Sequence, residues 1–144
     1  MTTREQVIAN ARNLVNVGWR RMGRDNAGVD CAGVAVVALR ASGYPVEDEA
    51  EYPLTGGGRL LEVLRRSFDV VDGAESAEPG DLLAVRVEPS KDAPPSHLMV
   101  LTDTRGVVHM DYGRMRVVEI TDASRWMRRV VATAKLRGVP KWQP

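Results

Sequence analysis

The sequence contains a single cysteine, Cys31, among its 144 residues. One cysteine cannot form a disulfide within the chain, so the fold cannot depend on an oxidising compartment. Long apolar stretches are missing as well. The uninterrupted apolar run that contains residues 33–39 is far short of the roughly 20 residues that cross a bilayer, and the first residues lack the apolar core of a signal peptide. We therefore expect a protein made in the cytoplasm without membrane insertion.

Neither sign of charge is in clear excess. The sequence has twenty Lys and Arg residues and nineteen Asp and Glu residues, which gives a net charge of +1. This balance gives no support for nucleic acid as a partner. No internal repeat or linker interrupts the sequence. A chain of this length can bury about two-thirds of its unfolded surface around one core, so we expect a single domain over residues 1–144.

The first half of the chain carries helical patterns. Thr3 begins a capping box, and the apolar spacing that follows predicts an amphipathic helix of roughly 13 residues that Gly18 ends. The elements expected next are a polar loop at 19–29, a largely apolar helix that begins at Cys31 and ends at Gly43, an exposed and mobile loop at 44–58, and a short surface helix at 60–68.

After the turn Pro79-Gly80-Asp81, the spacing of apolar residues changes from a helical to a strand pattern. Short segments rich in β-formers alternate with turn residues, which predicts an antiparallel meander. The expected strands cover 82–87, 98–101, 107–110, 115–120 and 129–136. Asp122 is a candidate N-cap for one helical turn that holds Trp126, and residues 138–144 are expected to be loose. Helices followed by strands predict an α+β fold with segregated layers.

Cys31 stands where the polar loop meets the apolar helix, directly after Asp30. Asp is a good N-cap residue, so Cys31 is expected in the first helical turn, where free backbone N–H groups and the helix dipole stabilise an anion. Such surroundings can lower the pKa of a thiol and make it a nucleophile. The alternative is an inert cysteine that packs as a small hydrophobic side chain.

The sequence also has only two histidines, His97 and His109, and each lies at the edge of a predicted strand of one hairpin. Both imidazoles can therefore lie side by side on one face of the sheet. If this face packs against the start of the Cys31 helix, His97 is the base, His109 orients it, and the Cys31 backbone N–H holds the oxyanion.

Two alternatives compete with this interpretation of the histidines. Either one can be a half-buried structural residue at a strand edge. A zinc site built from Cys31 and the two histidines is the other alternative. The 66 positions between Cys31 and His97 do not follow metal-ligand spacing, so we expect no metal.

Four motifs resemble those of the NlpC-type cell-wall cysteine peptidases, which have a reduced papain-like fold. They are Asp30-Cys31-Ala32-Gly33, Pro79-Gly80-Asp81-Leu82, His97-Leu98-Met99-Val100 and Val108-His109-Met110. Further details resemble the branch encoded by tailed bacteriophages and gene-transfer agents, among them Gly23-Arg24, Tyr52-Pro53, Val117-Val118-Glu119 and the Trp126 region. The chain is thus similar to this family over nearly its whole length.

The resemblance implies that Cys31, His97 and His109 are catalytic and that Trp19, Asp30 and Ala32 contact substrate. The substrate it implies is the stem peptide of peptidoglycan, cut between D-glutamate and a diamino acid without any cofactor. It also implies a place in the tail tip of a virion, with other tail-tip or baseplate proteins as partners. This sequence departs from the family pattern at Trp19, where a tyrosine is usual, at Ala32 in place of Ser, and at Met99 in place of Gly. The alternatives are a tail-tip subunit with little activity and a papain-like acyltransferase, although many of the latter place His before Cys.

Overall fold

The computed structural model describes residues 1–49 and 58–144. Part of the loop expected at 44–58, including the Tyr52-Pro53 pair, lies outside the described residues.

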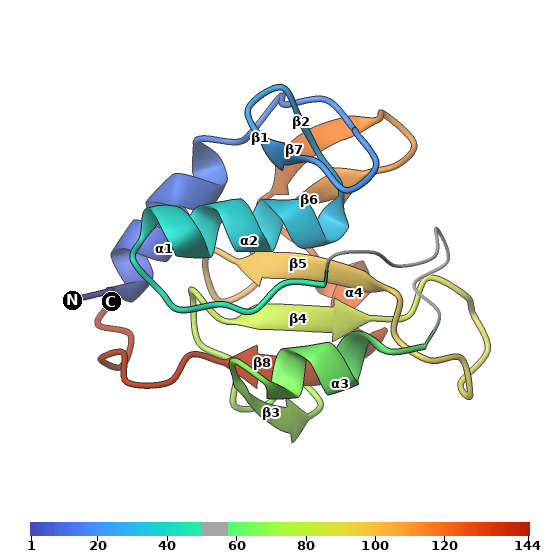
Figure 1. Ribbon diagram of the computed structural model, residues 1–144. Coiled ribbons are helices and arrows are strands. Elements are labelled where there is room, and N and C mark those ends of the chain that lie inside the picture. Colours follow the sequence, from blue (N-terminus) through green and yellow to red (C-terminus); the bar gives the residue numbers. More distant parts are fainter. Residues whose placement is uncertain (50–57) are drawn as a thin grey trace.

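Within the described residues, six strands form one antiparallel sheet, here named the main sheet, in the order β3-β8-β4-β5-β6-β7 (Figure 1). The strands are β3 (Asp69–Asp72), β4 (Leu82–Val85), β5 (His97–Leu101), β6 (Val107–Asp111), β7 (Arg116–Ile120) and β8 (Val130–Lys135). The expected meander from β4 to β7 is confirmed. β3 was not predicted from the sequence; its four residues pair with β8 at the far end of the chain.

Helices cover both faces of the main sheet. α2 (Cys31–Ala41) lies across β5 and β6, with α1 (Arg4–Arg12) beside it, and α3 (Leu60–Arg65) packs near β3 and β8 (Figure 1). α4 (Ser124–Met127) lies on the opposite face, as the side chains packed there show. The α+β fold is confirmed, and the helical layer predicted from the first half of the chain corresponds to α1, α2 and α3.

Side chains of the strands alternate between two hydrophobic clusters, one on each face of the sheet. The cluster beneath α2 includes Val34, Ala35 and Leu39 of the helix and Leu82, Leu98, Val100, Val108 and Met110 of the strands. The cluster on the α4 face includes Leu83, Val85, Met99, Leu101 and Val107, with Ala123 and Trp126 packed on them. This alternation follows from the two-residue period of a strand, and it decides which face each histidine occupies.

The signals at the helix ends were largely interpreted correctly. Thr3 and Gln6 form the predicted capping box of α1. The helix has nine residues, fewer than expected, because the chain leaves it to run along the edge of β7, where the N–H of Asn16 donates to the Val117 carbonyl at 2.9 Å. The N-cap of α4 is Ala123 and not the predicted Asp122, whose carboxylate instead accepts a hydrogen bond from the Ser124 N–H at 3.1 Å.

The loop expected at 19–29 contains a small hairpin of β1 (Arg24–Asp25) and β2 (Gly28–Val29). The hairpin packs closely on the first turn of α2. A Cβ atom on Gly33 of the helix would collide with the carbonyl oxygen of Gly23. The glycines therefore allow the loop to approach the helix start, next to Cys31.

Residues 138–144 are anchored and not loose, contrary to the sequence-based expectation. The buried Arg4 donates from Nε to the Pro140 carbonyl at 3.0 Å, and the N–H of Trp142 donates to Glu78 at 3.1 Å. Arg4 also forms ion pairs with Asp81 at 2.8 Å and Glu78 at 3.3 Å. A buried charge is tolerated when it is paired, so this network holds the two ends of the chain side by side (Figure 1).

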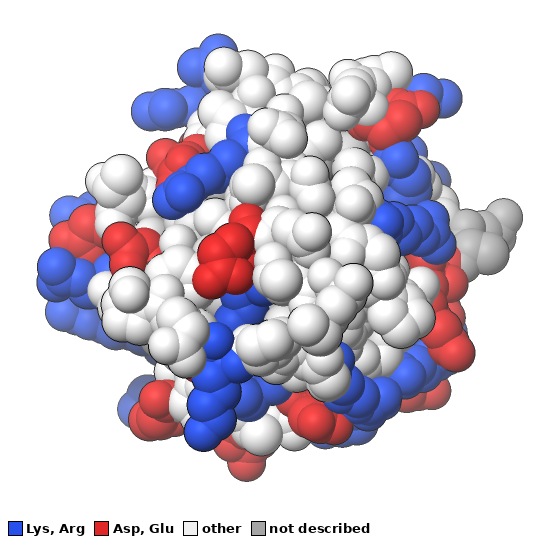
Figure 2. All heavy atoms as spheres, turned by 90° about the vertical axis from the view of Figure 1, so that its left-hand side faces the viewer, with Lys and Arg blue, Asp and Glu red and all other residues white. Residues whose placement is uncertain are grey.

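The face that carries both chain ends shows Lys and Arg side chains interspersed with Asp and Glu (Figure 2). This view agrees with the nearly neutral net charge. Among the helices of the described residues, none has the length and apolar character needed to cross a membrane.

Candidate active site

Cys31 is the first residue of α2, as predicted. Asp30 caps the helix, since its Oδ1 accepts a hydrogen bond from the backbone N–H of Gly33 at 2.8 Å. At this position the N–H of Cys31 has no acceptor within the helix. The start of α2 therefore presents a partly buried thiol and a backbone donor on the same residue.

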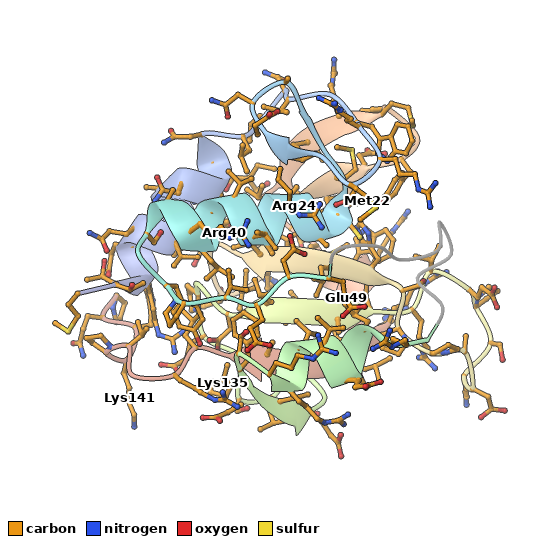
Figure 3. All side chains as sticks on the ribbon, in the orientation of Figure 1. Met22, Arg24, Arg40, Glu49, Lys135 and Lys141 are labelled. Atoms are coloured by element: carbon orange, nitrogen blue, oxygen red, sulfur yellow. The ribbon has the colours of Figure 1, made fainter. Side chains whose placement is uncertain are left out.

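The Asp30 carboxylate is held by more than the helix cap. Arg24 Nη1 donates to Oδ1 at 2.8 Å, and the Met22 N–H donates to Oδ2 at 3.0 Å. Arg24 also binds Asp48, with 2.7 Å between Nε and Oδ2. Figure 3 shows Arg24 and Met22 near the N-terminal end of α2. In this structure Asp30 fixes the loop around the nucleophile, and its contact with substrate stays a prediction.

The surroundings of the Cys31 sulfur keep it protonated at rest. Burial raises the pKa of the thiol, hydrogen bonds from the Leu98 backbone and the Tyr112 hydroxyl lower it, and the nearby Asp30 carboxylate raises it. The balance is a raised pKa. The sequence had suggested a lowered pKa at the helix start, and that expectation is wrong for the resting site because burial outweighs the hydrogen bonds.

His97 and His109 form a buried pair. The distance between His97 Nε2 and His109 Nδ1 is 2.8 Å, and the two residues are 2% and 4% exposed. The expectation that the two imidazoles lie side by side on one face is thus confirmed. His97 Nδ1 and His109 Nε2 are buried without a hydrogen-bond partner in the described structure. A proton on His97 Nε2, donated to His109, leaves His97 Nδ1 free as a base.

Both imidazoles are uncharged at neutral pH. Burial, and to a lesser extent the neighbouring His109, lower the pKa of His97 to about 3, while Asp111 acts to raise it. Burial also lowers the pKa of His109, again against Asp111. With a protonated thiol nearby, the resting site therefore holds neutral groups and not a thiolate and imidazolium pair. A proton must move when the sulfur attacks.

The histidines lie on the face of the main sheet opposite α2. They share this face with Met99 and Val107 because strand side chains alternate. The backbone pairing of β5 with β6 ends at Val100 and Val108, before either histidine. Trp126 of the α4 face packs on both rings, with centroid distances of 5.9 Å to His97 and 5.8 Å to His109. Trp126, from the helical turn expected after Asp122, therefore shields the histidine pair.

Cys31 and His97 meet at the same end of β5. The thiol contacts the backbone of Leu98, the residue after His97. Within the described residues, Cys31 and His97 share no direct hydrogen bond, so the complete Cys-His-His triad stays a prediction. The structure does bring together the histidine pair and the start of α2, as Figure 1 shows for the beginning of β5 and the right-hand end of α2.

Tyr112 is a site residue that was not predicted from the sequence. Its hydroxyl accepts a hydrogen bond from the Cys31 backbone N–H at 3.3 Å, and its ring lies 5.7 Å from the His97 ring. The available signal was its position three residues after His109, in a predicted turn. That position alone does not reveal a contact with Cys31, which lies 81 positions earlier in the chain.

The remaining predicted substrate residues are Ala32, which follows Cys31 on α2, and Trp19, which forms a bridge with Val29 in the loop before the helix. Ala32 is partly buried and lines a small apolar cavity of about 50 Å³ together with Leu98, between α2 and α3. Trp19 packs its partly buried side chain against the core, and its N–H donates to the Met115 carbonyl at 2.9 Å. Their contacts with substrate stay predictions.

Among residues 1–49 and 58–144, no group of three or more His, Cys, Asp or Glu side chains is arranged to hold a metal ion. The groups gathered at the site are a thiol, a histidine pair, a tyrosine hydroxyl and backbone donors. These groups can carry out nucleophilic and acid–base chemistry.

Solved structures identify the fold. The chain superposes on the NlpC/p60 domain of the peptidoglycan hydrolase SagA with a TM-score of 0.66 and 15% identity, over 93% of this chain and 99% of that one. The fold is that of the NlpC/p60 domains. NlpC2 from Trichomonas vaginalis gives a TM-score of 0.73 at 13% identity, over 93% of this chain and 47% of that one.

A further similar structure was solved with a reaction product. Ly7917 with the hydrolysing product of MDP gives a TM-score of 0.59 at 14% identity, over 94% of this chain and 64% of that one. No family model matches the sequence, and no curated protein matches it. The likeness is therefore one of structure, and it confirms the papain-like fold expected from the four motifs.

Proposed function

We propose that this protein is a peptidoglycan hydrolase that cuts amide bonds of the stem peptide with Cys31 as nucleophile. The observation that carries the proposal is the buried histidine pair, joined at 2.8 Å, beside the capped helix start that bears the thiol. The fold supports it, because SagA is named a peptidoglycan hydrolase and Ly7917 was solved with the product of MDP hydrolysis.

In this mechanism His97 Nδ1 takes the thiol proton as the sulfur attacks the carbonyl carbon. His109 accepts the Nε2 proton of His97 in a hydrogen bond and so stabilises the imidazolium that forms. The Cys31 N–H donates to the oxyanion. His97 then gives its proton to the leaving amine, and a thioester to Cys31 remains. A water molecule, deprotonated by His97, hydrolyses the thioester and releases the acid and the free thiol.

The bond that we propose is cut lies between D-glutamate and the diamino acid of the stem peptide. This assignment rests on the four motifs shared with the NlpC-type peptidases. Ala32, the residue after the nucleophile, is one of the proposed substrate contacts, and with Leu98 it lines a small apolar cavity. Trp19 and Asp30 are the other proposed substrate contacts.

The test is digestion of purified peptidoglycan by the wild-type chain and by Cys31→Ser, with the released muropeptides analysed by mass spectrometry. A hydroxyl beside an imidazole is a much weaker nucleophile than a thiol, and the substitution keeps the shape of the side chain. We expect release by the wild type and none above background by Cys31→Ser. Equal release by both proteins would refute the assignment of Cys31, and the masses identify the bond that is cut.

We further propose that the protein acts from the tail of a phage or phage-like particle, next to other tail-tip proteins. This proposal rests on the motifs shared with the phage branch. Quantitative mass spectrometry of purified virions tests it, with stoichiometric amounts expected in the tail. Absence from virions, with abundance in the lysate, would point instead to a soluble lysis enzyme. If the protein is present in virions and Cys31→Ser leaves their penetration of the cell wall unchanged, a structural subunit would be favoured.

A further inference from the structure

Tyr112 lies in the turn between β6 and β7, yet it contacts the start of α2. Its hydroxyl accepts the backbone N–H of Cys31 at 3.3 Å and hydrogen-bonds to the thiol of the same residue. Its ring lies edge-on to His97, with 5.7 Å between the centroids and 65° between the planes. Tyr112 thus touches both the proposed nucleophile and the proposed base.

The turn that carries Tyr112 is fixed from both sides. Asp111 Oδ1 accepts the N–H of Gly113 at 2.8 Å and that of Arg114 at 3.2 Å. The Met115 carbonyl accepts the N–H of Trp19 at 2.9 Å, which ties the turn to the loop before α2. The phenol therefore reaches Cys31 from a held backbone, although 46% of the residue is exposed.

We propose that the Tyr112 hydroxyl is a catalytic hydrogen-bond donor, first to the Cys31 sulfur and then to the carbonyl oxygen of the substrate. This inference rests on the proposed function, in which Cys31 is the nucleophile. The hydroxyl lies within hydrogen-bond reach of the Cys31 N–H, so an oxygen that accepts from that N–H comes within reach of the hydroxyl as well. Two donors then converge on the place where negative charge develops.

The phenol acts by donation and keeps its proton. Burial raises the pKa of Tyr112, and the nearby Cys31 raises it further, so the hydroxyl stays protonated at neutral pH. In the resting site the hydroxyl acts as a hydrogen-bond partner of the sulfur and lowers the pKa of the thiol. As the sulfur attacks and charge moves to the carbonyl oxygen, the hydroxyl can turn and donate to that oxygen. The proton balance of the reaction is carried by His97 alone.

The first experiment measures the thiol without any peptidoglycan. The rate of Cys31 alkylation by iodoacetamide is followed against pH for the wild type and for Tyr112→Phe, which removes only the hydroxyl. Cys31 is the single cysteine, so the reaction reports one site. Loss of a donor to the thiolate should raise the apparent pKa of Cys31 by about one pH unit, that is, about tenfold slower alkylation at a fixed pH below it.

Arg114→Gln is the matched control, because Arg114 lies in the same turn with its side chain exposed, 3.9 Å from Asp111. We expect the wild-type alkylation profile from it. An unchanged or lowered apparent pKa in Tyr112→Phe would overturn the inference, and so would an equal shift in Arg114→Gln, which would show that the turn and not the hydroxyl matters.

The second experiment measures kcat and KM on muropeptides. Loss of one oxyanion donor should lower kcat of Tyr112→Phe by about a hundredfold with little change in KM. A kcat of Tyr112→Phe equal to or higher than that of the wild type would overturn the inference. If the wild type does not cut peptidoglycan but the alkylation shift is present, the proposed function fails while the action of Tyr112 on the thiol is supported.

Discussion

The buried histidine pair should make the protein sensitive to mild acid. His97 has a pKa of about 3 in the folded protein, against an ordinary value of 6.5. Because the folded-state pKa is the lower one, the unfolded chain binds the extra proton. The free energy of unfolding therefore falls as pH drops below about 6.5, and it continues to fall until the folded-state pKa is reached.

The size of the loss follows from these two values. Between about pH 7.5 and pH 5, proton binding to His97 in the unfolded chain removes about 2 kcal/mol of stability. His109 adds to the loss in the same direction, since its pKa is also lowered. Most carboxylates titrate below this window. The chain has no other histidine, so these two residues dominate the proton uptake.

Urea denaturation at several pH values measures the effect in the wild type and in His97→Gln. Glutamine does not titrate, and its amide can still donate to His109, so the variant should lose about 2 kcal/mol less than the wild type over the same window. The m-value should stay constant if both proteins unfold in two states. A free energy of unfolding of the wild type that does not change with pH, or one that changes equally in both proteins, would refute the conclusion that His97 is buried in its neutral form.

Three further predictions concern the same region. His109→Ala should reduce muropeptide turnover by roughly one to three orders of magnitude, and His109→Asn should recover part of it, because an amide oxygen can accept the His97 proton; equal rates would indicate a purely structural His109. Trp126→Ala should admit water to the pair and raise the pKa of His97 in an NMR titration, whereas an unchanged titration would exclude shielding by the indole. Asp30→Ala should lower the free energy of unfolding by about 2 kcal/mol, since it removes a helix cap and leaves Arg24 without that partner; a loss below about 0.5 kcal/mol in urea denaturation would contradict the anchoring role.

The site was only partly predictable from the sequence. Some of its features depend on neighbouring residues in the chain, and others depend on burial in the folded protein. The placement of His97 at the start of β5 and of His109 on the neighbouring strand followed from the strand patterns and the short turn between them. Their contact at 2.8 Å lies beyond the paired part of the two strands, so the strand pairing alone does not fix it. The pKa of the Cys31 thiol was predicted in the wrong direction, since helix position is visible in a sequence and burial is not.

Elements with local sequence signals could be predicted before the structure was known. The capping box at Thr3, the Asp30 cap of α2 and the meander from β4 to β7 all depend on side chains a few residues apart or on the two-residue strand period. The motifs around Cys31 and His97 also indicated the papain-like fold, which the comparison with solved structures confirmed. Each of these features has its physical cause within a short stretch of chain.

Contacts between distant stretches of the chain could not be predicted before the fold was known. β3 forms by pairing with the edge of β8, and Arg4 anchors the last residues through a hydrogen bond to Pro140. The Tyr112 hydroxyl accepts a hydrogen bond from Cys31, 81 positions away in the chain. None of these leaves a periodic or capping signal. They arise when the packed core fixes the distance between elements and buried polar groups must find partners among whatever the fold brings near.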